Sequence, residues 1–212
     1  MSDRRHLDAL VVDVELVLIS VVQGVALTTL AVEATPVLHQ HLAASYPLAI
    51  AGLLFVLAFW SAALVHAVSF VSWPMDLVHY FFYFALALLE CLTFGQMERP
   101  RDWFAYSCVA YVACLALYAY DDAMMRGRRV AFESTPARRR LFDHMLRRQR
   151  LELFGFMPAG IAFNAAAWWW LGRDAGAATA WGWAQVVLSL VFLADLVRAF
   201  GHRQRIIAEA AG

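Results

Sequence analysis

The stretch Pro74–Met97, with the sequence PMDLVHYFFYFALALLECLTFGQM, decides the fold class of this chain. It is long enough for a helix that crosses a bilayer, which needs about 20 mostly apolar residues. Asp76, His79, Tyr83 and Glu90 fall on one side of that helix at about 100° per residue. Ionisable groups at membrane depth usually face the bundle interior or a water-filled cavity. We therefore expect these four residues, named here the acid–histidine stripe, to line a transport pathway.

The composition of the whole chain supports the same class. Of the 212 residues, 62% are hydrophobic and 16% are charged, and the mean hydropathy is +0.59. Soluble domains carry nearer 25% charged residues, and here the apolar residues come in long blocks. Cys91, Cys108 and Cys114 lie inside such blocks, so neither a disulfide framework nor a zinc site is expected.

The apolar blocks predict an all-α integral membrane protein that forms a single domain over residues 1–212. Six transmembrane helices are expected, at about residues 10–32, 48–70, 74–97, 103–120, 151–171 and 178–200. The first is too long for a signal peptide and carries Asp13 and Glu15, so we expect it to remain uncleaved. Pro36 and Pro47 are expected to interrupt the chain between the first two helices.

Residues 121–150 form a loop rich in arginine, and Pro136 precedes a stretch in which apolar residues recur at helical spacing. This pattern is typical of an amphipathic helix on anionic lipid headgroups. The arginines expected to contact the membrane surface are Arg138, Arg139, Arg140, Arg147 and Arg148.

The distribution of arginine predicts the topology. With the N-terminus in the cytoplasm, the opposite side holds only Arg99, Arg101 and Arg173, so the positive-inside rule places both termini inside. The chain has no lysine and many alanines, a composition typical of GC-rich bacterial genomes, and we expect it in the cell inner membrane.

This orientation brings acidic side chains to the cytoplasmic membrane boundary. Asp13 would extend the pathway of the stripe, while Glu15, His66 and Asp195 would form a vestibule that concentrates cations. A simpler interpretation stays open: acids at helix ends pair with the arginine-rich loop. It applies best to the residues that border this loop, which are Asp121, Asp122 and Glu152.

Glu90 is harder to explain as a helix-end charge. It lies beyond the midpoint of its helix, about 10 Å from the end at Met97, and no basic residue of that helix can reach it. Glu90 is therefore protonated, or it bonds to another helix, or water reaches it. Pro158 and Gly160 predict a kink in the fifth helix, and Asn164 lies close to it. The amide of Asn164 would either connect two helices or bind a ligand, and the sequence leaves both interpretations open.

Three classes of function fit these features. The first is a channel or transporter for a small cation or protons, formed by a homo-oligomer because six helices are few for a pore. The second is a scaffold or signalling subunit that docks a soluble cytoplasmic partner through the arginine-rich loop. The third is a membrane enzyme whose site opens at the cytoplasmic interface. Its metal ligands, or its acid and base acting on a lipid-like substrate, would be His66, Asp76, His79 and Asp13.

Several activities are excluded or not expected. The sequence contains no Walker A loop, GxGxxG, GxSxG, HExxH or CxxC motif, so we assign no catalytic residue and expect no cofactor. The arginine-rich loop lacks interleaved aromatic residues, so no nucleic-acid partner is expected.

Overall fold

The computed structural model describes residues 2–40, 42–69, 77–127 and 136–211. Within the helices, the side chains of residues 2–13, 15, 64–69, 136–138 and 206–211 are not described. The described part consists of helices and short turns, without a β-strand.

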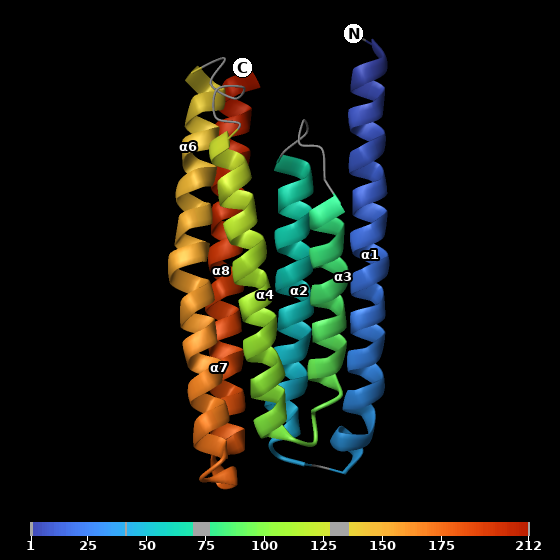
Figure 1. Ribbon diagram of the computed structural model, residues 1–212, viewed down its shortest axis with the longest axis vertical. Coiled ribbons are helices and arrows are strands. Elements are labelled where there is room, and N and C mark those ends of the chain that lie inside the picture. Colours follow the sequence, from blue (N-terminus) through green and yellow to red (C-terminus); the bar gives the residue numbers. More distant parts are fainter. Residues whose placement is uncertain (1, 41, 70–76, 128–135, 212) are drawn as a thin grey trace.

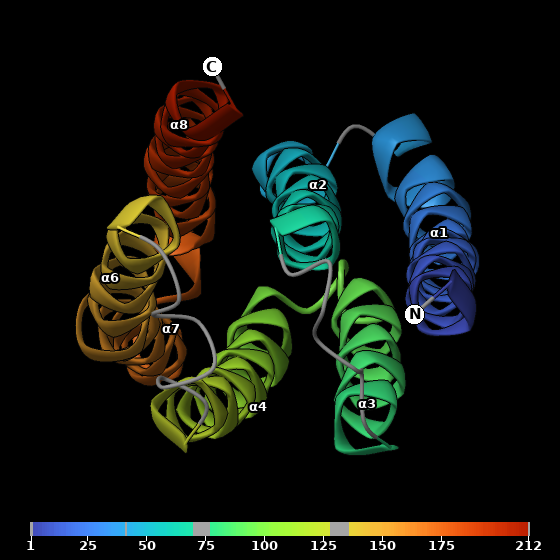
Figure 2. The same cartoon turned by 90° about the horizontal axis from the view of Figure 1, so that it is seen from above.

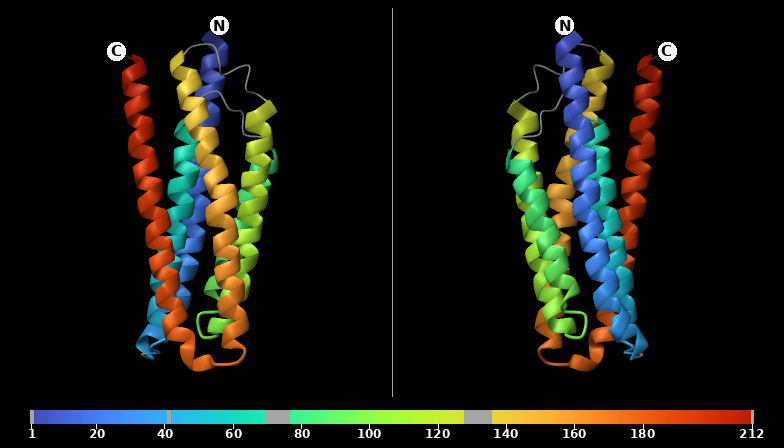
Figure 3. Two further views of the ribbon diagram at one scale, coloured as in Figure 1. Left: turned by 90° about the vertical axis from the view of Figure 1, so that its left-hand side faces the viewer. Right: turned by 90° about the vertical axis from the view of Figure 1, so that its right-hand side faces the viewer.

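The helices run up and down along one axis (Figure 1). Their order is α1 (Ser2–His39), α2 (Ser45–Ser69), α3 (Leu77–Phe94), α4 (Pro100–Gly127), α6 (Pro136–Leu151), α7 (Met157–Leu171) and α8 (Ala178–Ala211). The π-helical segment η1 (Glu152–Phe156) joins α6 to α7, and the 3₁₀ turn η2 (Ala175–Ala177) precedes α8. Figure 3 shows α6, η1 and α7 as one continuous helical rod, and both chain ends lie at the same end of the bundle.

Seen from above, the helices form a ring (Figure 2). Around the ring, α1 packs against α2 and α3, α3 against α4, α4 against α7, and α2 against α8, while α6 packs against α8 and closes the ring. We name the end with both termini the termini end. The opposite end, with the turns α1–α2, α3–α4 and α7–α8, is named the turn end.

Within the described residues, five helical segments are long and apolar enough to cross a membrane. They are Leu16–His39, Ser45–Ala63, Leu77–Phe94, Pro100–Gly127 and Ala175–Arg205. Large apolar side chains such as Phe81, Leu88 and Val197 are exposed on the outside of the ring, as expected where lipid replaces water. This is the architecture of an all-α membrane protein.

The predicted fifth span, residues 151–171, is divided between three elements. Its regular part, α7, has 15 residues and extends about 22 Å, less than the bilayer's hydrocarbon thickness. Pro158 lies in the first turn of α7, and because proline has no N–H, the backbone before it cannot keep regular α-helical hydrogen bonds. The π turn η1 absorbs this defect directly before the proline.

Three helices continue past their predicted ends, which are therefore wrong. α8 continues to Ala211, beyond the predicted end at 200. α1 continues through Pro36 to His39, beyond the predicted end at 32, because a proline close to the end of a helix disrupts few backbone hydrogen bonds. The Thr35 hydroxyl donates to the Ala31 carbonyl over 2.7 Å beside this point. α4 continues to Gly127, beyond the predicted end at 120, and its last turns are stabilised by an ion pair between Asp122 and Arg126.

The core at the turn end is apolar and closely packed. Phe94 and Phe104 are fully buried, Trp103 is nearly so, and all three join residues of α1, α2, α7 and α8 in one cluster. Gly52 allows this packing, since a Cβ there would lie 2.8 Å from Leu30 Cδ1. Apolar side chains from five helices and the start of α4 therefore fill the interior at the turn end.

Candidate functional site

The described members of the acid–histidine stripe all face the inside of the ring. His79, Tyr83 and Glu90 are 1%, 4% and 1% exposed, although α3 presents Phe81, Phe84 and Leu88 to the outside. The predicted period of the helix thus separates a polar inner face from an apolar outer face. The fourth member, Asp76, lies outside the described residues.

Glu90 meets a partner from another helix. Gln23 Nε2 of α1 donates to Glu90 Oε2 over 3.0 Å, and Gln23 itself is 4% exposed. The remaining oxygens, Gln23 Oε1 and Glu90 Oε1, are buried without a hydrogen-bond partner among the described residues. Since the structure pairs no described basic side chain with Glu90, an ionised carboxylate here would carry a large desolvation cost.

His79 forms a second buried pair, with α4. His79 Nε2 lies 2.7 Å from Asp121 Oδ1, and the Tyr120 ring meets the imidazole edge-on with centroids 5.4 Å apart. Asp121 thus pairs with the stripe, whereas the neighbouring Asp122 pairs with Arg126. The simpler interpretation of helix-end acids paired with arginine therefore describes Asp122 and not Asp121.

A third polar cluster joins α6, η1 and α8. Arg148 Nε donates to Glu152 Oε1 over 2.6 Å, and Arg148 Nη1 donates to Asp195. Burial lowers the pKa of Arg148, but the two carboxylates outweigh this and raise it overall. Glu152 thus behaves as the simpler interpretation predicts.

The α6 helix differs from the expectation of a helix lying flat on headgroups. It stands along the bundle axis (Figure 1), and its apolar residues Phe142, Met145 and Leu146 pack against Met125 of α4. Arg148 is 7% exposed and does not face the membrane surface. Arg139, Arg140 and Arg147 are exposed, and the side chain of Arg138 lies outside the described residues.

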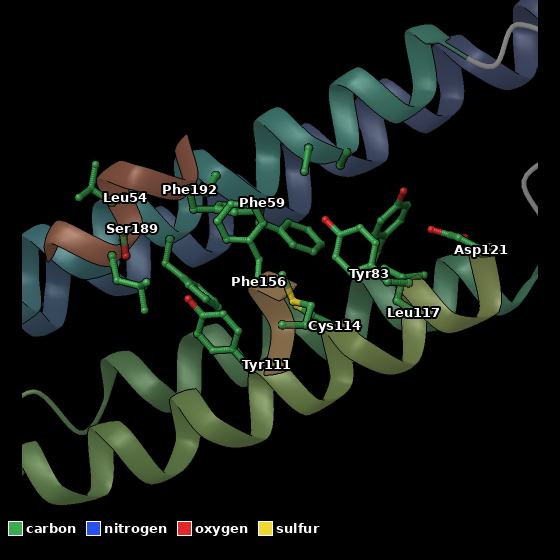
Figure 4. Close-up of a pocket in the computed structure, with 17 residues that line it drawn as sticks. Leu54, Phe59, Tyr83, Tyr111, Cys114, Leu117, Asp121, Phe156, Ser189 and Phe192 are labelled. Atoms are coloured by element: carbon green, nitrogen blue, oxygen red, sulfur yellow. The ribbon is translucent and has the colours of Figure 1, made fainter. Parts of the chain in front are cut away.

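A cavity of about 100 Å³ opens between α2, α3, α4, α8 and the η1–α7 junction. Figure 4 shows Asp121 at one end of this cavity, Tyr83 and Phe156 further along, and Leu54, Tyr111 and Ser189 towards the other end. A site for one water needs about 10–15 Å³, so the cavity holds several waters or a small ligand group.

Between the cavity and the turn end, a chain of buried amides connects three helices. Trp103 Nε1 donates to Gln185 Oε1 over 2.8 Å, and Gln185 Nε2 donates to Asn164 Oδ1 over 3.2 Å. Asn164 Nδ2 in turn donates to the Gly160 carbonyl over 2.8 Å. Asn164 is fully buried in this chain, so it connects helices and is not offered to a ligand.

The side chains of three further predicted site residues, Asp13, Glu15 and His66, lie outside the described residues. Of the predicted vestibule the structure describes Asp195, which pairs with Arg148. No group of three or more His, Cys, Asp or Glu in the described residues could hold a metal ion.

The sequence suggested the arginine-rich loop as the partner of Asp121, whereas the structure pairs Asp121 with His79. The sequence did not connect Tyr111 with Ser189, which both line the cavity. A signal for this site was present on the fourth helix. Tyr111, Cys114 and Tyr118 recur at helical spacing in an otherwise apolar helix, and all three line the cavity.

The fold and the site define a multi-pass α-helical membrane protein with buried ionisable groups around an interior cavity. Compared with protein-family models, with curated proteins and with solved structures, the chain has no match.

Proposed function

We propose that the protein is a membrane transporter for protons or a small cation. The observation that carries this proposal is the buried contact between Gln23 and Glu90. Glu90 is 1% exposed, lies on a helix long and apolar enough to span a membrane, and has no basic partner among the described residues. Ionisable groups inside membrane proteins are costly, and they commonly mark ion pathways and proton relays.

The buried groups on α3 suggest a route. His79 and Asp121 lie near the termini end, Tyr83 lines the cavity beside Asp121, and Glu90 lies deeper on the same face of α3. In this proposal a proton or cation enters at the His79–Asp121 pair, and the carboxyl of Glu90 takes part further along.

The packing favours a carrier over an open channel. At the turn end, the Trp103–Gln185–Asn164 chain and the apolar core around Phe94 and Phe104 fill the interior. A path through this end requires a second conformation, which is how transporters work. Because the cavity lies inside one ring of helices, a single chain has its own pathway, and the homo-oligomer expected from the sequence is not required.

We also propose six membrane crossings with both termini in the cytoplasm, in the inner membrane. Both chain ends lie at one end of the bundle, which requires an even number of crossings (Figure 1). The rod of α6, η1 and α7 then supplies the crossing that the five long apolar helices leave out. The exposed Arg139, Arg140 and Arg147 would lie near anionic headgroups on the cytoplasmic side.

The test is ion flux into proteoliposomes under imposed proton, potassium and sodium gradients. Glu90→Gln removes the ionisable group but keeps a side chain that can bond to Gln23, so we expect folded protein with flux reduced to background. The double variant Gln23→Glu/Glu90→Gln restores one acid and one amide across the same contact, and we expect it to regain part of the flux.

Glu98→Gln is the matched control, because Glu98 is exposed at the turn end and its loss should leave flux unchanged. Normal flux in Glu90→Gln would remove Glu90 from the mechanism. Absence of flux in the wild type under every gradient would remove the transport proposal.

A second candidate is a subunit that docks a soluble partner, favoured by the exposed arginines of α6. Arg139, Arg140, Arg147 and Arg150 are exposed while the apolar face of this helix is buried, so they are free to meet an acidic surface. A partner that copurifies with the wild type and is lost when these four arginines are replaced by glutamine would support this candidate.

A further inference from the structure

We propose that the interior cavity binds a hydrophobic organic cation, with the carboxylate of Asp121 as its counter-ion. If the proposed transport function holds, this cation is the transported substrate, and to that extent the inference rests on the proposed function. The binding of the cation is a separate property of the cavity.

The cavity has the lining of a small-molecule site. Its walls come from five parts of the ring, and they include seven aromatic side chains. These are Phe55, Phe59, Tyr83, Tyr111, Tyr118, Phe156 and Phe192. Pockets for organic ligands are typically apolar and aromatic with a few polar groups that fix orientation. The volume of about 100 Å³ exceeds what isolated waters need.

The charge of the lining selects the ligand. Asp121 is the only carboxylate among the described lining residues, and none of these is Arg, Lys or His. Aromatic faces attract cations through their ring quadrupole, and they offer nothing comparable to an anion. A ligand with an apolar body and one positive group therefore matches both features, with the positive group next to Asp121 at the end of the cavity (Figure 4).

The basic groups near Asp121 are already engaged. Arg126 pairs with Asp122, and Arg148 pairs with Glu152 and Asp195. From α3, His79 contacts Asp121 directly and Tyr83 lies beside it in the wall; from α4, Tyr118 lines the same wall and Tyr120 packs on the imidazole. His79 is thus the described group that shares Asp121 with a bound cation.

This sharing predicts how a proton and the ligand interact. A protonated His79 neutralises Asp121, whereas a neutral His79 leaves its charge for the ligand. Binding of the cation should therefore release a proton from His79, and protonation of His79 should weaken binding of the cation. This competition couples the two ions, as an exchange transporter requires.

The experiment is equilibrium dialysis of purified full-length protein with radiolabelled benzyltrimethylammonium, which has one aromatic ring and one fixed positive charge. Two unlabelled competitors separate the effect of charge from that of shape. Neopentylbenzene has the same shape as the probe without its charge, and benzenesulfonate is an anion. We expect saturable binding that benzenesulfonate does not displace and that neopentylbenzene displaces about tenfold less well.

Two variants link the binding to the cavity. Asp121→Asn should weaken binding about tenfold or more, since it removes the desolvated counter-ion. Asp122→Asn is the matched control, because this neighbouring carboxylate does not line the cavity, and binding should be unchanged. If Asp121→Asn fails to fold, Ala62→Phe, which fills the cavity from α2, should abolish binding while the acid is kept.

Several results would overturn the inference. They are absence of saturable binding, equal displacement by neopentylbenzene, and binding that survives both Asp121→Asn and Ala62→Phe. The dialysis needs no membrane or gradient, so it is independent of the flux measurement. Binding without flux would reject the transport function alone, and flux without binding would reject this ligand alone.

Discussion

At the scale of single residues, the chemistry of the interior depends on which side chain meets each acid. Asp121 meets an imidazole, Glu90 a carboxamide, and Glu152 and Asp195 a guanidinium. The guanidinium pair is a permanent structural contact, because arginine stays protonated. The other two acids meet side chains that carry no permanent charge.

His144 of α6, which lies before the predicted span 151–171, offers a pH-dependent contact. Its ring lies 4.7 Å from that of His202 of α8, measured between centroids. Burial lowers the pKa of His144 from its usual 6.5, and the nearby His202, Arg203, Arg147 and Arg148 lower it further. The pKa of His144 in the folded state is thus below that in the unfolded chain. The contribution of a neutral His144 to stability is therefore fully present above about pH 6.5 and is lost as the pH falls through the folded-state pKa.

We therefore expect the melting temperature in detergent to fall when the pH is lowered from about 7.5 to 5.5. His144→Gln should show a smaller fall, because the variant has no proton to take up at this position. His39→Gln should keep the full fall, since His39 is exposed at the turn end. A wild-type fall that His144→Gln leaves unchanged would show that His144 is not the group responsible.

At the scale of elements, α4 and α7 pack closely because α7 has a glycine where α4 has a tyrosine. A Cβ added to Gly160 would overlap the ring of Tyr111, which also lines the cavity. The same contact supports the amide chain, because the Gly160 carbonyl accepts from Asn164.

Gly160→Ala should destabilise the protein by about 1–3 kcal/mol, since Tyr111 must move or the helices must separate. Thermal unfolding in detergent measures the change, and benzyltrimethylammonium binding should weaken with it. Gly24→Ala is the control: a Cβ there meets nothing within 4 Å, so its stability should be unchanged or slightly higher. Equal stability of Gly160→Ala and wild type would contradict the close α4–α7 contact.

At the scale of the whole molecule, the ring explains why polar groups from distant parts of the sequence meet. α1 contacts α3, and α2 contacts α8, so residues such as Gln23 and Glu90 come together although 67 positions separate them. The interior formed in this way holds ion pairs towards the termini end, and an apolar core with uncharged amide contacts towards the turn end.

Reporter fusions test the proposed topology. A cytoplasmic reporter such as a fluorescent protein should be active at either terminus and within residues 128–135. A periplasmic reporter such as alkaline phosphatase should be active after Gln96 or Arg173, at the turn end. Opposite locations of the two termini would mean an odd number of crossings, and the rod of α6, η1 and α7 would then not span the bilayer.

The sequence by itself determined the class of the protein and the orientation of α3. Apolar length and helical period depend only on neighbouring residues, so the helical segments and the inward side of His79, Tyr83 and Glu90 follow from local information. The predicted ends at residues 32 and 120 were wrong, because the end of an apolar block marks the end of a membrane span and the helix itself continues beyond it.

Only the tertiary structure decided which groups meet. Nothing in the sequence pairs Gln23 with Glu90 or His79 with Asp121, because helix neighbours in a ring are set by packing across the whole bundle. The same holds for Arg148, which a helical pattern places on a polar surface but which α8 buries against Asp195. The cavity exists only where five elements converge, so its lining could be identified only after the fold had brought them together.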